Sequence, residues 1–230
     1  MTGPHLRHGH SADDPRALAH EVGSNFWSLV AREDLKAETV LDVGCGTGSA
    51  TRRLATVARR VVGLDVDPKA LDRAKREAEE CRVKNVEFVQ GDATAADYAK
   101  FGPLAMVTSH YFMEDGVVRR AGAALPRGGT LVFACFHPDR YREAGIESRF
   151  GYSEERMRGL LEESGFAVEA LLVERERARV ASYGEACMVF GERAVRRWKE
   201  DGRWEAVARF IDRGGGMVTL ATLVGKGRKI

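Results

Sequence analysis

Three glycines with unusual spacing, Gly44, Gly46 and Gly48, lie in the segment Val40–Ser49, between an apolar run and a helix-forming run. Because glycine has no Cβ atom, such a turn lets the backbone approach a ligand closely. The third glycine comes one residue earlier than in the G-x-G-x-x-G pattern of dinucleotide-binding turns, and the segment contains no Lys or Arg to meet phosphate. It also lacks the G-K-[ST] of a P-loop. The turn therefore favours a ligand without a pyrophosphate group.

An acid follows the next apolar run. Asp65 ends the run that begins at Arg60, and it stands 21 residues after Gly44. A carboxylate in that place can accept two hydrogen bonds from a ribose diol, and it would repel a 2′-phosphate. A nucleoside without phosphates fits these residues better than a dinucleotide does.

Apolar runs that predict strands alternate with helical patterns along the chain. A capping acid at Asp67 followed by Pro68 marks the start of one helix. This alternation predicts an α/β fold with a doubly wound, mostly parallel sheet and helices on both faces. Ligands of such sheets bind beyond the carboxyl ends of the strands, where the glycine turn and Asp65 fall. The expected strands are 39–43, 60–64, 86–89, 104–108, 130–136, 166–175 and 217–224.

Four motifs occur in one order: DVGCGTG at 42–48, GLDVD at 63–67, GDA at 91–93 and LPRGG at 125–129. The set resembles the class I S-adenosylmethionine-dependent methyltransferases, in their small-molecule and ubiquinone-biosynthesis-like branch. The resemblance covers residues 38–136 in motifs and about 15–175 in layout. It implies a Rossmann-like, seven-stranded sheet with an antiparallel last strand. It also implies methyl transfer (EC 2.1.1.-) from S-adenosylmethionine, with S-adenosylhomocysteine as product.

The resemblance further implies roles for single residues. Asp65 would bind the ribose hydroxyls, with Val66 against the adenine, while Asp92 and the Ala93 amide would bond the adenine ring. Asp42 either organises the turn or meets the ammonium group of the cofactor, and both readings stay open. The full set implied to bind the cofactor is Asp42, Gly44, Cys45, Gly46, Gly48, Asp65, Val66, Asp92, Ala93 and Ser109.

Methyl transfer is an in-line displacement with a good, neutral leaving group, so the enzyme mainly positions the acceptor. His110 and Tyr111 follow the fourth expected strand, where the family faces both cofactor and acceptor. His110 is a candidate base and Tyr111 a candidate for orienting the acceptor; the alternative is that both only pack locally. His137 is a second candidate base. An aromatic wall is expected from Tyr111, Phe112, Phe136, Tyr141, Phe150 and Tyr152.

We expect a single methyltransferase domain over residues 1–230. Phe26 or Trp27 could close over the cofactor or simply anchor a helix. The expected insertion would lie near the acceptor, where it could select the substrate, form a dimer contact, or do neither. The expected parts are a mobile arm at 1–14, a helical lid at 15–35, a core at 36–182, a helical insertion at 183–213, and the last strand and tail at 214–230.

Composition narrows the class of protein. The 230 residues are 44% hydrophobic and 30% charged, which fits a globular domain. No apolar run reaches the roughly 18 residues of a membrane span, and the first residues lack a secretory core, so a cytoplasmic protein without membrane contact is expected. We expect no metal, because His5, His8 and His10 lack companion ligands. The cysteines form no C-x-x-C pair and are expected to be reduced: Cys45, Cys81, Cys135 and Cys187.

A small molecule is the expected methyl acceptor. From Arg193 to Ile230, however, ten Lys or Arg stand against four Asp or Glu. This stretch leaves an RNA (tRNA) methyltransferase as an alternative, against the reading of a solvated helix face. Two further alternatives are disfavoured. The glycine spacing argues against an NAD-dependent oxidoreductase, and the intact glycine and acid set argues against a non-catalytic methyltransferase-like partner protein.

Overall fold

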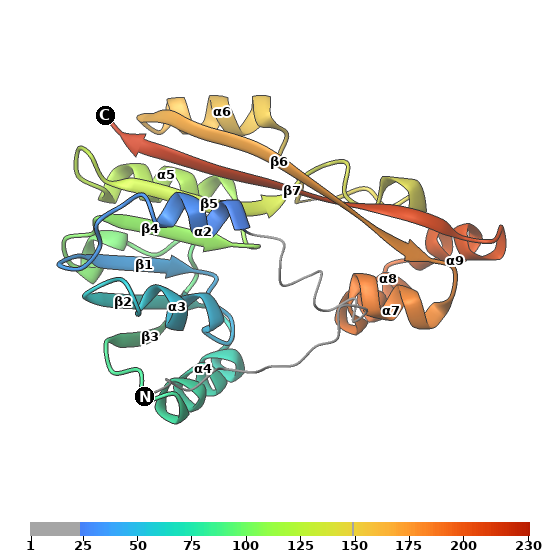
Figure 1. The fold of residues 1–230 in the computed structure, drawn as a ribbon, viewed down its shortest axis with the longest axis horizontal. Coiled ribbons are helices and arrows are strands. Elements are labelled where there is room, and N and C mark those ends of the chain that lie inside the picture. The colour runs from blue at the N-terminus through green and yellow to red at the C-terminus, as the bar shows by residue number, and fades with distance from the viewer. Residues whose placement is uncertain (1–23, 149) are drawn as a thin grey trace, which may run out of the picture.

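The computed structural model describes residues 24–148 and 150–230, and a mixed sheet of seven strands runs through its centre (Figure 1). The strand order is β3-β2-β1-β4-β5-β7-β6. Six strands point the same way, and β7 runs antiparallel to both of its neighbours, which confirms the predicted sheet. The strands are β1 (Thr39–Val43), β2 (Arg60–Asp65), β3 (Val86–Gln90), β4 (Met106–His110), β5 (Thr130–Phe136), β6 (Phe166–Val180) and β7 (Gly216–Lys229).

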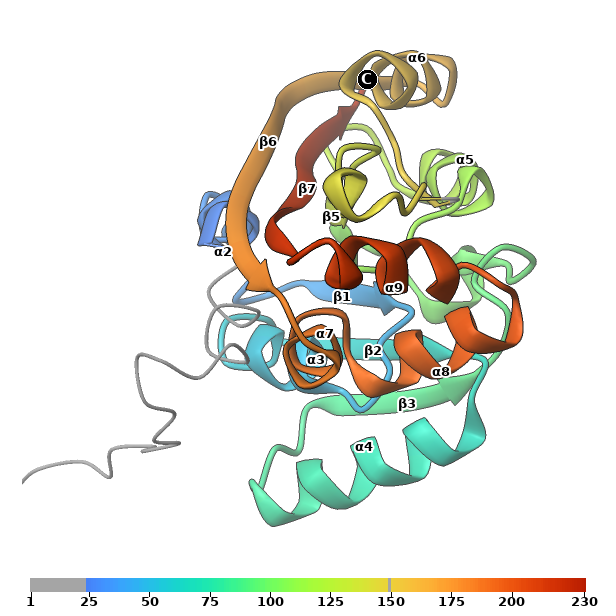
Figure 2. The same cartoon turned by 90° about the vertical axis from the view of Figure 1, so that its right-hand side faces the viewer.

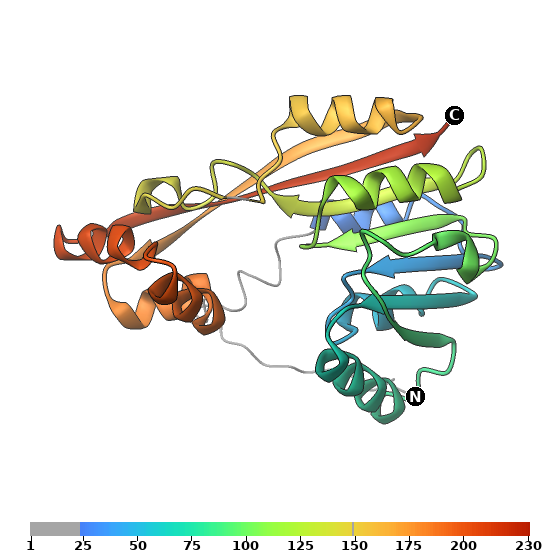
Figure 3. The same ribbon diagram turned by 180° about the vertical axis from the view of Figure 1, so that it is seen from behind.

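Helices cover both faces of the sheet, as a doubly wound fold requires. One apolar cluster joins the sheet to Phe26 of α2 and Leu54 of α3, and another joins it to Val117 of α5 and Leu161 of α6. The helices α2 and α3 lie in front of the sheet in Figure 1, whereas α5 and α6 face the viewer in Figure 3. The helices of this part of the chain are α2 (Ser24–Val30), α3 (Ser49–Leu54), α4 (Pro68–Glu80), α5 (Asp115–Ala124) and α6 (Glu154–Glu163), with short 3₁₀ helices η1 (Tyr98–Phe101) and η2 (Arg142–Ala144).

Local signals place the strands and helices around the expected site. Asp67 caps α4 as predicted, because its side chain accepts a hydrogen bond from the Lys69 N–H (2.9 Å), and Pro68 occupies the first turn. β4 begins and ends two residues later than expected. Ser109 and His110 are therefore the last residues of this strand rather than the start of the following loop.

β6 and β7 are much longer than the sequence suggested. β7 pairs with β5 only from Thr222 to Arg228, but it pairs with β6 as far as Gly216 opposite Val180. The hairpin thus projects beyond the rest of the sheet (Figure 1). The expected strand ended at Arg175, because charged residues dominate the sequence beyond it. The alternate residues of this part, among them Ala178, pack on the insertion and make it a strand.

The projecting hairpin carries three helices in the segment expected as a helical insertion, residues 183–213, which is called the insertion below. It consists of α7 (Tyr183–Phe190), α8 (Glu192–Glu200) and α9 (Trp204–Asp212). Buried side chains of these helices, including Phe190, Trp198 and Val207, form a core of their own with Tyr141 and the end of the hairpin. In Figures 1 and 2 these helices lie beyond the carboxyl ends of the central strands. The insertion therefore lies on the side of the sheet where a ligand is expected.

The expected arm at 1–14, its histidines and the first part of the lid lie outside the described residues. None of the helices at 24–148 and 150–230 has the length and apolar character needed to cross a membrane. Across those same ranges, no group of three His, Cys, Asp or Glu side chains is arranged to hold a metal ion.

Candidate functional site

The glycine turn is built from left-handed backbone. Gly44, Gly46 and Gly48 have φ values of 67°, 53° and 76°, a region that other residues rarely adopt. The N–H groups of Gly44 and Cys45 both donate to the carbonyl oxygen of Leu64, at 2.8 and 3.1 Å. The turn that follows β1 is thereby held against the end of β2, beside Asp65.

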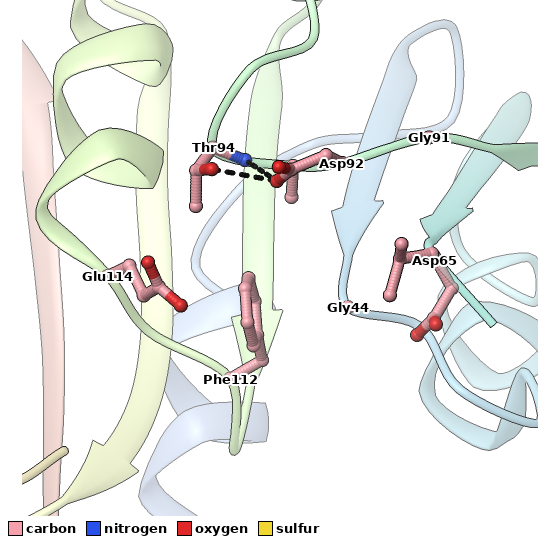
Figure 4. Close-up of a pocket in the computed structure, with 9 residues that line it drawn as sticks. Gly44, Asp65, Gly91, Asp92, Thr94, Phe112 and Glu114 are labelled. Atoms are coloured by element: carbon pink, nitrogen blue, oxygen red, sulfur yellow. Dashed lines mark hydrogen bonds between the residues drawn. The ribbon is translucent and has the colours of Figure 1, made fainter. Parts of the chain in front are cut away.

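Asp65 lies where the two strands end, and its carboxylate organises the turn. Its Oδ2 accepts a hydrogen bond from the Gly46 N–H (2.7 Å), and its Oδ1 accepts one from the Asp67 N–H (2.9 Å). A carboxylate has about four acceptor sites, so each oxygen keeps capacity for a ligand hydroxyl. Figure 4 shows the side chain at the edge of a cavity, opposite Asp92 and Phe112.

This glycine-turn cavity has a volume of about 330 Å³, within the usual range for small-molecule sites. Val66, next to the acid at Asp65, lines this cavity and is 66% exposed. An exposed apolar surface beside a carboxylate suits a ligand with one flat apolar part and one hydroxylated part. The lining residues are Gly44, Asp65, Val66, Gly91, Asp92, Ala93, Thr94, Phe112 and Glu114.

A second cavity of about 240 Å³, here called the aromatic cavity, adjoins the first. The two share Phe112 and Glu114, which come from the loop after β4. Arg197 reaches the aromatic cavity from α8 of the insertion. Two ligands could thus lie side by side and meet beside the loop after β4. The lining residues are Tyr111, Phe112, Met113, Glu114, Cys135, Phe136, Phe150 and Arg197.

Comparison with known proteins gives the family. Residues 40–129 match the family described as a methyltransferase domain. An rRNA methyltransferase of Streptomyces thermotolerans is 30% identical over 205 residues, which cover 84% of this chain and 57% of that protein. A ubiquinone biosynthesis O-methyltransferase of Methylocella silvestris is 35% identical over 149 residues, which cover 54% and 56%.

This chain carries a class I S-adenosylmethionine-dependent methyltransferase domain. The family predicted from the motifs is thereby confirmed. The chain spans a little over half the length of the curated relatives named above. A solved structure from Bacillus halodurans has the same fold, with a TM-score of 0.70 and 22% identity over 90% of this chain and 99% of that one.

The methyltransferase domain places Asp42 below the turn rather than in a cavity. Its carboxylate is buried and accepts hydrogen bonds from the hydroxyls of Thr51 (2.6 Å) and Thr108 (3.1 Å). Burial raises the pKa of Asp42 to about 6, although both hydroxyls act in the opposite direction. Asp42 thus links β1 to α3 and β4. This geometry supports the reading in which it organises the turn.

The other residues expected at the cofactor fall into two groups. Gly44, Val66, Ala93 and the two acids Asp65 and Asp92 line the glycine-turn cavity. Four more lie outside its lining and support the turn or the strand: Cys45, Gly46, Gly48 and Ser109.

Hydrogen bonds and burial define three of these side chains more closely. Asp92 Oδ1 accepts hydrogen bonds from the hydroxyl and the N–H of Thr94, at 2.7 and 2.8 Å. The bond from the hydroxyl is the largest cause of the lowered pKa of Asp92. The Ser109 hydroxyl donates to the carbonyl oxygen of Phe112, which shapes the loop between the cavities. Burial raises the pKa of the Cys45 thiol, which stays neutral.

The two candidate catalytic side chains, His110 and Tyr111, lie in different surroundings. The His110 ring packs against Phe26 of α2, with ring centroids 4.8 Å apart, and it lines neither of the two cavities. Its position supports the alternative of local packing. Tyr111 lines the aromatic cavity, near Phe136, and burial raises its pKa to about 12. Its phenol is therefore neutral near pH 7 and is suited to orienting a ligand rather than to removing a proton.

His137 is engaged elsewhere. Its Nδ1 accepts from the Asp139 N–H (3.1 Å), so its Nε2 carries the proton and donates to Glu154 (3.1 Å). Of the expected aromatic wall, four residues line the aromatic cavity, whereas Tyr141 packs into the insertion core. Tyr152 is buried, and its hydroxyl donates to Asp115 (2.6 Å).

Sequence reasoning missed Thr94, Glu114 and Arg197. Thr94 and Glu114 each lie within two residues of a predicted position, so the loops after β3 and β4 contain more of the site than the motifs indicated. Arg197 had no local signal. Only the length of the β6–β7 hairpin brings it to the cavity.

Proposed function

We propose that this chain transfers a methyl group from S-adenosylmethionine to a small-molecule acceptor. The observation that supports this most is the pair of adjoining cavities at the carboxyl edge of the sheet, with Phe112 and Glu114 in both. A transfer reaction between two bound molecules needs two sites whose reacting atoms can meet. The family and the cavities support the same reading.

The glycine-turn cavity fits the cofactor. Asp65 would accept hydrogen bonds from the ribose hydroxyls, and the exposed Val66 would contact one face of the adenine. Asp92 uses only its Oδ1 for Thr94 within the described residues, which leaves Oδ2 for the adenine amino group. A side chain at Gly44 would collide with Phe112 (2.6 Å), so the absence of a Cβ there lets Phe112 pack directly on the turn at the cavity wall.

When bound, S-adenosylmethionine supplies a methyl carbon to which an acceptor lone pair bonds in line, while the electrons of the breaking C–S bond stay on sulfur. The residues of the chain mainly position the acceptor, because the sulfur leaves as a neutral thioether. Phe112 and Glu114 form the junction where the reacting atoms would meet. Neither His110, which packs against α2, nor the Tyr111 phenol, which stays protonated near pH 7, is placed to remove a proton from the acceptor.

An RNA acceptor is the second candidate, and the similarity to an rRNA methyltransferase favours it. The basic stretch from Arg193 onward gives it less support than its composition suggested. Lys226 and Arg228 form ion pairs with Glu33 and Glu169 inside the protein, and Arg203 pairs with its neighbour Asp201. Cations that are already paired contribute little to holding a phosphate backbone.

Calorimetry of the full chain tests the cofactor. We expect S-adenosylmethionine and S-adenosylhomocysteine to bind with micromolar affinity and NAD to bind far more weakly. Asp65→Asn should weaken S-adenosylhomocysteine binding by about 1–3 kcal/mol, because one charged acceptor of the ribose is lost. Asp72→Asn is the matched control, since Asp72 is exposed on α4 and lies outside the cavity. Equal loss in both variants, or none in Asp65→Asn, contradicts the ribose assignment.

The choice between small molecule and RNA has its own measurement. An RNA-binding enzyme loses affinity steeply with salt, because phosphate contacts release counterions. We expect no salt-dependent binding of an rRNA hairpin or of tRNA at physiological ionic strength. Strong binding that falls steeply between 50 and 200 mM salt, roughly a thousandfold or more, would favour the RNA acceptor instead.

A further inference from the structure

The aromatic cavity carries two charges of opposite sign at different places. Glu114 lies at the junction with the glycine-turn cavity, and Arg197 lies in the part that the two cavities do not share. Within the described residues neither side chain has an ion-pair partner. A cation without a protein partner at the wall of a cavity is available to a ligand.

The fold holds Arg197 in this position. Its neighbour Trp198 is buried against Phe190 and Tyr141, with ring centroids 5.1 and 5.9 Å apart, and this packing fixes the rotation of α8. Arg196 on the same helix is also exposed but does not line the cavity. The insertion therefore presents one particular guanidinium to the space beside the methyl-transfer junction.

The other walls limit the shape of the occupant. The Tyr111 and Phe136 rings lie 5.9 Å apart, and Phe112 closes the side next to the cofactor. Aromatic rings pack well on a flat, conjugated molecule. The volume of about 240 Å³ lies below the range of roughly 300–1,000 Å³ found for drug-sized ligands. The cavity thus suits a ligand of about one ring.

We propose that the methyl acceptor is a small, single-ring compound that carries a carboxylate or a phosphate, and that Arg197 binds this anionic group. The guanidinium fork matches the two oxygens of such a group. Glu114 repels an anion at the junction, so the anionic end points toward α8 and the methyl-accepting atom points toward the cofactor. This inference rests on the proposed function, because it takes the glycine-turn cavity as the cofactor site.

Matched ligands of known charge test the proposal. The full chain, saturated with S-adenosylhomocysteine, is titrated in a calorimeter with benzoate, with its neutral counterpart benzamide, and with phenyl phosphate. We expect an anionic probe to bind about fivefold to twentyfold more tightly than benzamide. This range lies between the gain in affinity from an exposed ion pair and the gain from a buried hydrogen bond to a charged group. Comparison of benzoate with phenyl phosphate identifies which anion the site prefers.

Two variants locate the effect. Arg197→Gln should remove the preference for the anionic probes and leave benzamide binding within about twofold, because only the charge is lost. Arg196→Gln should keep the preference. Both variants should bind S-adenosylhomocysteine like the wild type, which also shows that they are folded.

The outcomes separate this inference from the proposed function. A wild type without preference for the anions, a preference that survives in Arg197→Gln, or an rRNA hairpin that binds while all three probes fail would overturn the acceptor class. Absence of S-adenosylhomocysteine binding would overturn the cofactor site itself.

Discussion

Gly44→Ala places a methyl group against Phe112, which lines both cavities. The new Cβ would lie 2.6 Å from Phe112 Cβ and 2.7 Å from its Cγ, too close for either to stay in place. The φ of 67° adds the strain of a left-handed residue, about 1–2 kcal/mol. Overpacking of this kind costs about 1–3 kcal/mol more. We therefore expect the free energy of unfolding to fall by about 2–5 kcal/mol.

Gly46→Ala is the matched control. Gly46 has a similar φ of 53°, but no described atom lies within 4 Å of a Cβ added there. Gly46→Ala should therefore lower the free energy of unfolding only by the backbone strain, about 1–2 kcal/mol. Gly128→Ala is a second control. Gly128 has a φ of 88° and similarly open space around an added Cβ, and it lies in a loop that lines neither cavity, so this variant should show the backbone strain alone.

Urea unfolding and calorimetry measure the two consequences. Gly44→Ala should be less stable than Gly46→Ala and should lose about tenfold or more in S-adenosylhomocysteine affinity, because Phe112 must move into one cavity. Gly128→Ala should keep the affinity of the wild type. Equal stabilities of the Gly44 and Gly46 variants would rule out the predicted clash, since the contact with Phe112 would then cost nothing.

Two further predictions concern buried charge. The pKa of Asp42 is raised from 3.8 to about 6, so between these pH values the folded state holds a proton that the unfolded state has lost. The contribution of Asp42 to the free energy of unfolding therefore falls by up to about 3 kcal/mol as the pH rises from about 4 to 6. Asp42→Asn should lack this fall in urea unfolding across that range, and an identical pH profile would contradict the assignment. Lys226 is 2% exposed beside Glu33 and Glu169, and Lys226→Met should lower the free energy of unfolding by about 1–3 kcal/mol, since both partly exposed carboxylates lose one of their two cations and keep Arg228. The exposed pair of Arg209 is the control: Arg209→Gln should cost less than about 1 kcal/mol, and a similar loss in both variants would contradict the special role of Lys226.

Several residues that line the glycine-turn cavity could be predicted because their determinants are local. Gly44 and Asp65 each stand at the end of a strand that the sequence marks clearly, and parallel neighbours bring such ends together. The structure adds that Asp65 also holds the turn through the Gly46 N–H. That bond joins two segments and has no sequence pattern of its own.

The aromatic cavity could be predicted only in part: four aromatic residues of its lining were expected, but Arg197 is distant from them in sequence. Arg197 reaches the aromatic cavity only through the long β6–β7 hairpin, whose outer half alternates charged residues with Ala178 and Val180. The charged residues concealed the strand. The choice of His110 as a base followed from its place after a strand, but its ring turns to Phe26 of α2, a contact that tertiary packing decides.

A crystal structure of the full chain with S-adenosylhomocysteine would show directly where the cofactor product binds. We expect the adenosine in the glycine-turn cavity, with its ribose hydroxyls on Asp65, its adenine against Val66, and its sulfur toward Phe112 and the aromatic cavity. A ligand bound elsewhere, or a ribose that does not touch Asp65, would contradict it.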